Sequence, residues 1–366
     1  MIEQSSGTSA ANTFNPAIGA VLTGQLADVD GGWEQVPGFL PAGEIGTGNS
    51  GFALGEAEIN MKAVVDANFF GNLTVAVGSD DGEVEVGLEE AWLQTTGLPH
   101  GLTMKAGRFF SETGYLNKFH GHADDFADRP LAYQAMLGGQ YVVDGAQLRW
   151  VVPAPLLVEF GAELDWGGSL PATVNARTSP GSWTLFSQFG GDIGLSSSWS
   201  LGLSRVSTAA VDRESGVSGE AFSGDSDLAS IDLVWKWAPE GNPTQRHAKI
   251  QAEYFHRTED GVFAGLPYAG EQTGWYVQGV WQFLQRWRVG YRYDFVEAND
   301  QPLFDGSALD GMGRSAQRNS LMFDWSPSEF SRLRLQYARD SVLPTTTTQW
   351  VLQYLFSIGA HGAHEF

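Results

Sequence analysis

Residues 287–295 read WRVGYRYDF, and two kinds of side chain alternate along them. The odd positions hold Trp287, Val289, Tyr291, Tyr293 and Phe295, and the even positions hold Arg288, Gly290, Arg292 and Asp294. Because successive side chains of a β-strand point to opposite faces, this stretch predicts a strand with one aromatic face and one charged face. Alternation alone also fits a soluble β-sandwich, so the other strands and their connections have to decide.

The same pattern recurs along the chain in segments of about ten residues, spaced about twenty apart. These segments are residues 17–26, 57–65, 73–79, 85–95, 102–109, 141–151, 156–166, 183–195, 199–206, 228–237, 246–255, 275–283, 287–295, 318–325, 333–337 and 350–358. Tryptophans stand at many strand ends, as in the aromatic girdle of a membrane interface. Short and long connections alternate, which is typical of outer-membrane barrels. We therefore predict an all-β fold: a transmembrane antiparallel β-barrel of about 16 strands, with short periplasmic turns and long extracellular loops.

The last of these strands places Trp350, Leu352, Tyr354, Phe356 and Ile358 on one face, which we expect to meet lipid. The chain then continues through GAHGAH to a terminal phenylalanine. Either the strand bends at Gly359, or it runs further than residue 358.

Composition narrows the class of protein. The 366 residues include 21 Lys+Arg and 43 Asp+Glu, giving a formal net charge of -22, which argues against nucleic acid as a partner. There is no cysteine, so a disulfide framework is excluded. No apolar run reaches the roughly 20 residues of a transmembrane helix. The first residues also lack the basic region and apolar core of a signal peptide, so we expect a mature chain located in the bacterial outer membrane.

We expect residues 1–13 to be a flexible N-terminus and residues 14–366 to form a single barrel. A ring of about 16 strands encloses an aqueous lumen, so a pore is the default function. Residues 111–130, SETGYLNKFHGHADDFADRP, follow a predicted strand and carry dense polar chemistry. We predict that the segment 110–130 is a constriction loop inside this lumen.

Five arginines fall on the polar faces of three successive predicted strands: Arg288, Arg292, Arg318, Arg332 and Arg334. Neighbouring strands lie about 4.8 Å apart, so these side chains could form one basic patch that attracts anions. Alternatively, they pair with Asp294, Asp324 and Asp340 and only line a wet wall. The predicted acidic lining consists of Glu56, Glu58, Glu159, Glu163, Glu253 and Asp294. Together with the negative net charge, it favours cations instead.

The predicted constriction loop also contains a candidate metal site. His120 and His122 flank a glycine, and Asp124 and Asp125 follow. Imidazole and carboxylate are ligands of Zn²⁺, so these four residues could bind zinc, the one cofactor we consider. The alternative is a polar loop that is hydrogen-bonded to the inner wall.

Residues 88–116, LEEAWLQTTGLPHGLTMKAGRFFSETGYL, resemble the phosphate-selective porin (O/P-like) family of Gram-negative outer membranes. Residues 144–153, DGAQLRWVVP, and residues 353–366, QYLFSIGAHGAHEF, look like a branch of such barrels that is loosely labelled zinc-regulated or receptor-like. The resemblance implies a channel of about 16 strands that forms a homotrimer. It does not identify the solute.

The predicted function is an outer-membrane porin, a passive diffusion channel for small hydrophilic or charged solutes. Its partners would be outer-membrane lipid and those solutes. One alternative is a zinc-linked channel or receptor-like barrel, and another is a structural barrel or conduit that binds a partner protein. An enzyme is not expected, because the sequence has no GxSxG, HExxH, P-loop or cysteine nucleophile.

Overall fold

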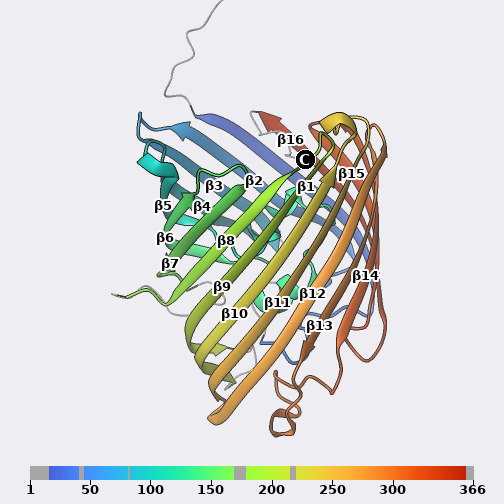
Figure 1. Cartoon of the computed structure of the whole chain (residues 1–366). Helices are drawn as coiled ribbons and strands as arrows, with labels where there is room; N and C mark the ends of the chain where they lie inside the picture. The colour runs from blue at the N-terminus through green and yellow to red at the C-terminus, as the bar shows by residue number, and fades with distance from the viewer. Residues whose placement is uncertain (1–15, 41–44, 81–82, 169–178, 215–219, 360–366) are drawn as a thin grey trace, which may run out of the picture.

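A single closed β-barrel makes up the molecule. The computed structural model describes residues 16–40, 45–80, 83–168, 179–214 and 220–359. Sixteen antiparallel strands follow one another around the ring, and the ring closes where β1 pairs with β16 (Figure 1). A closed ring leaves no unpaired strand edge, which a lipid environment requires. The prediction of a 16-stranded all-β barrel is confirmed.

The strands differ in length around the ring. They are β1 (Ala17–Asp30), β2 (Gly51–Val64), β3 (Phe69–Asp80), β4 (Glu83–Thr95), β5 (Leu102–Phe110), β6 (Val142–Val151), β7 (Leu157–Asp165), β8 (Ser182–Ile193), β9 (Ser197–Glu214), β10 (Ala221–Trp237), β11 (His247–Phe263), β12 (Leu266–Leu284), β13 (Trp287–Ala298), β14 (Ala316–Ser328), β15 (Ser331–Asp340) and β16 (Thr347–Gly359). Helical structure comprises α1 (Leu131–Leu137) and the 3-10 turns η1 (Pro99–Gly101), η2 (Leu116–Lys118), η3 (Gly121–Ala123), η4 (Pro239–Gly241) and η5 (Pro302–Phe304). Within the described part of the chain, no helix is long and apolar enough to span a membrane.

Strands β9 to β12 are longer than the sequence pattern predicts. Residues 207–227 and 258–274 were expected to be long loops, but most of them continue the β-ladder, with Asp225 opposite Ala209 and Asp260 opposite Ala269. As a result β12 has 19 residues, whereas β5 and β7 have 9 each. Their serines, glycines and aspartates look like loop residues in isolation, but pairing with neighbouring strands keeps them extended. One wall of the barrel therefore extends further than the other, toward the bottom of Figure 1.

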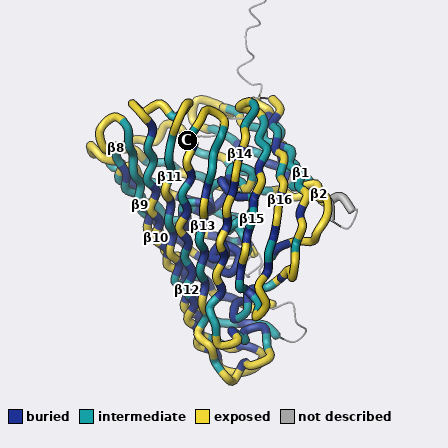
Figure 2. The backbone as a smooth tube through the Cα atoms, turned by 90° about the vertical axis from the view of Figure 1, so that its right-hand side faces the viewer, coloured by how far each residue is buried: buried dark blue, intermediate teal, exposed yellow. Residues whose placement is uncertain are grey.

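The two faces of each strand differ as the alternation predicts. On β16, Trp350 is 49% exposed and Tyr354 is 47% exposed, while Val351 and Leu355, the residues that directly follow them, are buried. On β13, Tyr291 points outward and Arg292 is buried in the interior. Figure 2 shows this alternation of buried and exposed residues along the strands. The outer surface is thus apolar and the inner surface polar, as in a barrel that spans a membrane. The strand β16 ends at Gly359, and residues 360–366, which follow it, lie outside the described residues.

Connections at one rim fold inward and fill part of the lumen. The longest of those described, residues 111–141 between β5 and β6, is called the luminal segment below, and it ends in α1, all of whose residues are buried (Figure 1). Helix α1 packs against β12 and β13 within an apolar cluster. Trp33 and Phe39 from the β1–β2 connection and Val342 from the β15–β16 connection join the same cluster. The lumen is therefore narrowed by an internal core.

Candidate functional site

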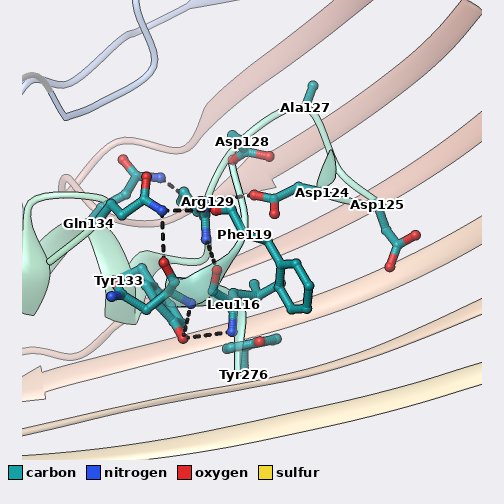
Figure 3. Close-up of polar contacts among 12 residues, drawn as sticks. Leu116, Phe119, Asp124, Asp125, Ala127, Asp128, Arg129, Tyr133, Gln134 and Tyr276 are labelled. Atoms are coloured by element: carbon teal, nitrogen blue, oxygen red, sulfur yellow. Dashed lines mark hydrogen bonds and ion pairs between the residues drawn. The ribbon is translucent and has the colours of Figure 1, made fainter. Parts of the chain in front are cut away.

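The luminal segment is held together by contacts among its own residues. Arg129 donates hydrogen bonds to the main-chain carbonyls of Leu116 and Phe119 and forms an ion pair with Asp124 at 2.9 Å (Figure 3). The hydroxyl of Tyr133 on α1 accepts the main-chain N–H of Leu116 at 3.1 Å. The bonds to the N–H of Leu116 and the carbonyl of Phe119 satisfy main-chain groups that the 3-10 turn itself leaves without partners.

Two aspartates of the segment reach the predicted basic wall. Asp128 forms ion pairs with Arg292 on β13 at 3.1 Å and with Arg318 on β14 at 2.9 Å. Asp125 forms one with Arg288 at 3.0 Å. Each of these pairs lies in the interior, where water screens it little. The segment is thus fastened electrostatically to β13 and β14.

The remaining arginines of the wall also have partners. Arg334 donates to the main-chain carbonyl of Asp124 at 2.7 Å and pairs with Asp324 at 3.0 Å. Arg332 donates to the same carbonyl at 3.3 Å. Lys249 on β11 adds a further ion pair to Asp125.

All five predicted arginines do lie together on the luminal face. They contact the luminal segment and the wall aspartates Asp294, Asp324 and Asp340. These contacts are those of the second sequence interpretation, in which the arginines pair with carboxylates, extended by the aspartates of the segment. The patch is consequently neutralised within the chain.

The aspartates of the segment differ in their proton affinity. Burial raises the pKa of Asp124 to about 6, because the cations Arg129, Arg334 and Lys249 do not compensate for the loss of water and the nearby charge of Asp125. Burial opposes the charge of Asp125 as well, but Lys249 and Arg288 outweigh it and lower the pKa of Asp125 below its usual range. The carboxyl group of Asp125 is therefore ionised, and cations surround it.

Two of the predicted acidic residues, Glu253 and Glu163, bind the luminal segment. Glu253 on β11 accepts the main-chain N–H groups of Tyr115 at 2.8 Å and Leu116 at 3.2 Å, and also the hydroxyl of Tyr133 at 2.8 Å. Glu163 on β7 accepts the hydroxyl of Ser111 at 2.6 Å. Carboxylates that accept main-chain N–H groups hold a chain firmly, because charge-assisted bonds are the stronger ones.

The other predicted acidic residues each have a different partner. Asp294 accepts the N–H of Leu131 at the start of α1 at 3.1 Å. Glu159 lies beside Arg149 at 3.5 Å, away from the segment's main chain. Glu58 is buried against the two histidines described next. The side chain of Glu56 lies outside the described part of the structure.

The predicted metal ligands have different partners. His120 and His122 turn toward β2 and β4, with their rings stacked at 5.6 Å between centroids, whereas Asp124 pairs with Arg129 of the segment and Asp125 pairs with Arg288 on β13. The ring nitrogens of His120 lie 3.0 Å from Glu89 and 3.0 Å from Glu90. Burial opposes the charge of the imidazolium, but the surrounding carboxylates prevail and raise the pKa of His120. The two aspartates and the two histidines therefore do not form one set of metal ligands.

An open cavity of about 500 Å³ remains beside the segment. It is lined by residues of β2, β4, β5, β11 and the segment: Lys62, Glu90, Trp92, Lys105, Phe110, Glu112, Tyr115, Leu116, Lys118, Phe119, His120, His122, Ala123, Asp124, Asp125 and Lys249. The ammonium group of Lys105 lies 5.1 Å from the ring centres of both Trp92 and Phe109. Lys105 forms no ion pair with any residue that the structure describes. A cation over the face of an aromatic ring is attracted by the quadrupole of the ring, so the two rings help to position the Lys105 ammonium group at this cavity.

Sequence reasoning missed several of these residues. Lys105, Lys249 and Tyr133 were not predicted, although alternation along β5 and β11 could have placed the two lysines on the luminal face. Nothing in the sequence pattern indicates that the hydroxyl of Tyr133 meets Glu253, because the two residues are 120 positions apart.

Comparisons with known proteins support the fold. No protein-family model matches the chain. An uncharacterized protein of Aquifex aeolicus (strain VF5) is 30% identical over 342 residues, an alignment that covers 86% of this chain and 70% of that protein. That degree of identity over most of both chains indicates common descent.

Several solved structures share the barrel. The outer-membrane channel DcaP of Acinetobacter baumannii superposes with a TM-score of 0.59 at 13% identity, covering 94% of this chain and 97% of that one. The anion-selective porin from Comamonas acidovorans gives 0.59 at 10% identity and covers 94% and 99%. The trimer form of OmpT from Vibrio cholerae gives 0.56 at 12% identity and covers 94% and 99%. The chain therefore belongs to the same family as the uncharacterized Aquifex aeolicus protein, and its fold is that of the 16-stranded outer-membrane porins.

Proposed function

We propose that the protein is an outer-membrane porin that passes small hydrophilic solutes by passive diffusion. The observation that carries the proposal is the open cavity beside the luminal segment, inside a closed ring whose outer face is apolar. Strands with an apolar outer face and a charged inner face suit a barrel between lipid and water. The rim with short turns would then face the periplasm, and the long connections would face outward.

The luminal segment sets the size of the solute. It is bound to β13 and β14 through Asp128 and to β2 and β4 through His120, and the free space beside it is lined by residues of β2, β4, β5 and β11. A space of about 500 Å³ suits one small organic molecule with its hydration water, not a folded chain. A narrow, solute-sized route favours a porin over a conduit for a partner protein.

The charge lining the open space is mixed. Lys62, Lys105 and Lys118 face it together with Glu90 and Glu112, so we propose passage of charged or zwitterionic solutes with modest selectivity. The arginine patch contributes little to selectivity, because the chain's own carboxylates occupy it. Phosphate selectivity, which the resemblance to the O/P-like porins implies, would have to come from the lysines.

A homotrimer is part of the proposal. It is supported by the resemblance to O/P-like porins and by the trimer form of the similar OmpT barrel. The short strands β5 to β7 give this side of the ring a lower wall, which would suit packing against neighbouring copies. Chemical cross-linking in native membranes would give monomer, dimer and trimer bands on a gel, with no larger species.

Conductance across a planar lipid bilayer tests the function. Purified, refolded protein should insert in discrete steps and carry a steady ionic current, because water and ions fill the open cavity. Vesicles that contain the protein should swell in solutions of small sugars, because these sugars pass through the channel. They should not swell in solutions of larger sugars. A barrel that inserts but stays electrically silent would reject the porin and favour a structural or partner-binding barrel.

A further inference from the structure

Five acidic and imidazole side chains converge from β2, β4 and the luminal segment. They are Glu58, Glu89, Glu90, His120 and His122, called the acid–imidazole cluster below. The Nδ1 atom of His120 lies 3.1 Å from Glu58 and 3.0 Å from Glu89. The facing atoms of these three residues all lie within 4.8 Å of one another. They surround one small space instead of forming separate pairs.

The spacing suits a single metal ion. Ligand atoms at about 2.1 Å from a tetrahedral Zn²⁺ lie roughly 3.4 Å from each other. The distances of 3.0 and 3.1 Å around Nδ1 of His120 are close to this value, so an ion requires only small outward shifts. Glu89 is partly exposed to the lumen, which gives an ion and its remaining water ligand a way in.

The second ring nitrogen of His120 is held in place by a carboxylate. Its Nε2 atom lies 3.0 Å from a carboxylate oxygen of Glu90. Glu90 is itself held by the indole N–H of Trp92 at 2.9 Å and by the side-chain amide of Asn72 at 3.2 Å. A histidine that binds metal through one nitrogen commonly donates its other N–H to such a carboxylate, which fixes the ring and its tautomer.

Charge points in the same direction. Three carboxylates face two imidazoles, and Glu58 is 4% exposed, so the cluster keeps a net negative charge even when both imidazoles carry a proton. A divalent ion would restore the balance where water cannot. Mixed nitrogen and oxygen ligands favour Zn²⁺ and related first-row ions over Ca²⁺ or Mg²⁺.

We propose that Glu58, Glu89 and His120 bind a divalent transition-metal ion of the Zn²⁺ class, with Glu90 positioning the imidazole. This set replaces the sequence-based set of His120, His122, Asp124 and Asp125, because Asp124 pairs with Arg129 and Asp125 pairs with Arg288. His122 contacts Glu58 at 2.7 Å and steadies that ligand from behind. The ion ties the luminal segment to β2 and β4, opposite the ties to β13 and β14. The site does not depend on the channel proposal, because a silent barrel could hold it equally well.

Binding of Zn²⁺ to the chelator-treated full chain in detergent tests the site. The parent for all comparisons carries alanine at His361 and His364, which removes the imidazoles of the tail. Calorimetry should show one Zn²⁺ per chain, and Co²⁺ should give the strong visible absorption of a four-coordinate ion. His120→Ala should abolish both signals. Glu90→Gln, which keeps the ligands but weakens their support, should lower the affinity by about 10–100-fold.

A matched control separates this site from ordinary imidazole–carboxylate contacts. His256 on β11 lies 3.8 Å from Glu271 in a half-exposed pair, so His256→Ala should leave the affinity for Zn²⁺ unchanged. Heat-modifiable migration on gels should show that every variant is a folded barrel. Absence of Zn²⁺ binding by the parent would overturn the proposal. Equal binding by the parent and the folded His120→Ala variant would overturn it as well.

Discussion

Arg292 donates one hydrogen bond to the carboxylate of Asp128 at 3.1 Å and another to its main-chain carbonyl at 2.8 Å. The two residues are 164 positions apart, one on the wall and the other in the luminal segment. An arginine on a channel wall would ordinarily attract solute anions. Here it binds an anion of the same chain, which turns a selectivity element into an anchor.

Removing the charge of Asp128 should therefore loosen the segment. Asp128→Asn leaves Arg292 and Arg318 without this shared carboxylate in the interior, so the free energy of unfolding should fall by on the order of 3 kcal/mol. Current noise in single channels should rise. Asp227→Asn, which breaks the exposed pair with Arg205, should cost less than about 1 kcal/mol. Denaturant titration in lipid vesicles measures both, and equal losses would contradict the anchoring role.

Lys105 should influence ion selectivity more than the arginines do. It lines the open cavity, whereas Arg334 is 2% exposed and paired with Asp324. Lys105→Met should shift the reversal potential in a KCl gradient toward cations. Arg334→Met removes the same charge, but it should shift the potential less. A larger shift for Arg334→Met would mean that solutes pass along the arginine wall instead.

The hydroxyl of Tyr133 should contribute measurably to stability. It accepts two main-chain N–H groups and donates to Glu253, all in the interior. Tyr133→Phe leaves the main-chain N–H of Asn117 without this acceptor and removes one donor from Glu253, so we expect a loss of about 1–3 kcal/mol in the free energy of unfolding. Tyr354→Phe on the outer face should change it by less than about 0.5 kcal/mol. Indistinguishable unfolding curves for the two variants would argue against the hydrogen-bond network.

The outer face should reject charge according to its depth in the bilayer. Leu352 lies within β16 and is 42% exposed, whereas Ile358 stands near the end of the strand. Leu352→Arg should cost about 2–4 kcal/mol and Ile358→Arg about 0–1 kcal/mol when the barrel folds reversibly into lipid vesicles. Equal and small costs at both positions would show that this face does not meet the hydrocarbon.

Alternation was sufficient to predict the ring, because each strand's two faces meet different solvents. The outward row of Trp350, Leu352 and Tyr354 and the inward position of Arg292 follow from a period of two residues. Strand ends were predicted less well on β9 to β12. There small and polar residues such as Ser207 and Asp225 carry no clear pattern, and pairing with a neighbour decides.

The path of the luminal segment could not be read from the sequence. Local composition indicated a polar loop in the lumen, and the residues 111–130 do lie there. Which wall each side chain meets depends on the folded backbone. His120 and Asp125 are five positions apart, yet they face carboxylates and cations respectively. Contacts across a barrel join residues with no shared periodicity, so sequence spacing overestimated the closeness of the histidines and aspartates.

The segment also has a mechanical effect on the ring. A cylinder held only by bonds between neighbouring strands can flatten into an ellipse at little cost. The luminal segment is tied to β2 and β4 through His120, to β7 through Ser111, to β11 through Tyr115 and to β13 and β14 through Asp128. Like the spokes of a wheel, these ties resist flattening from several directions, so the cross-section of the barrel is kept round from within.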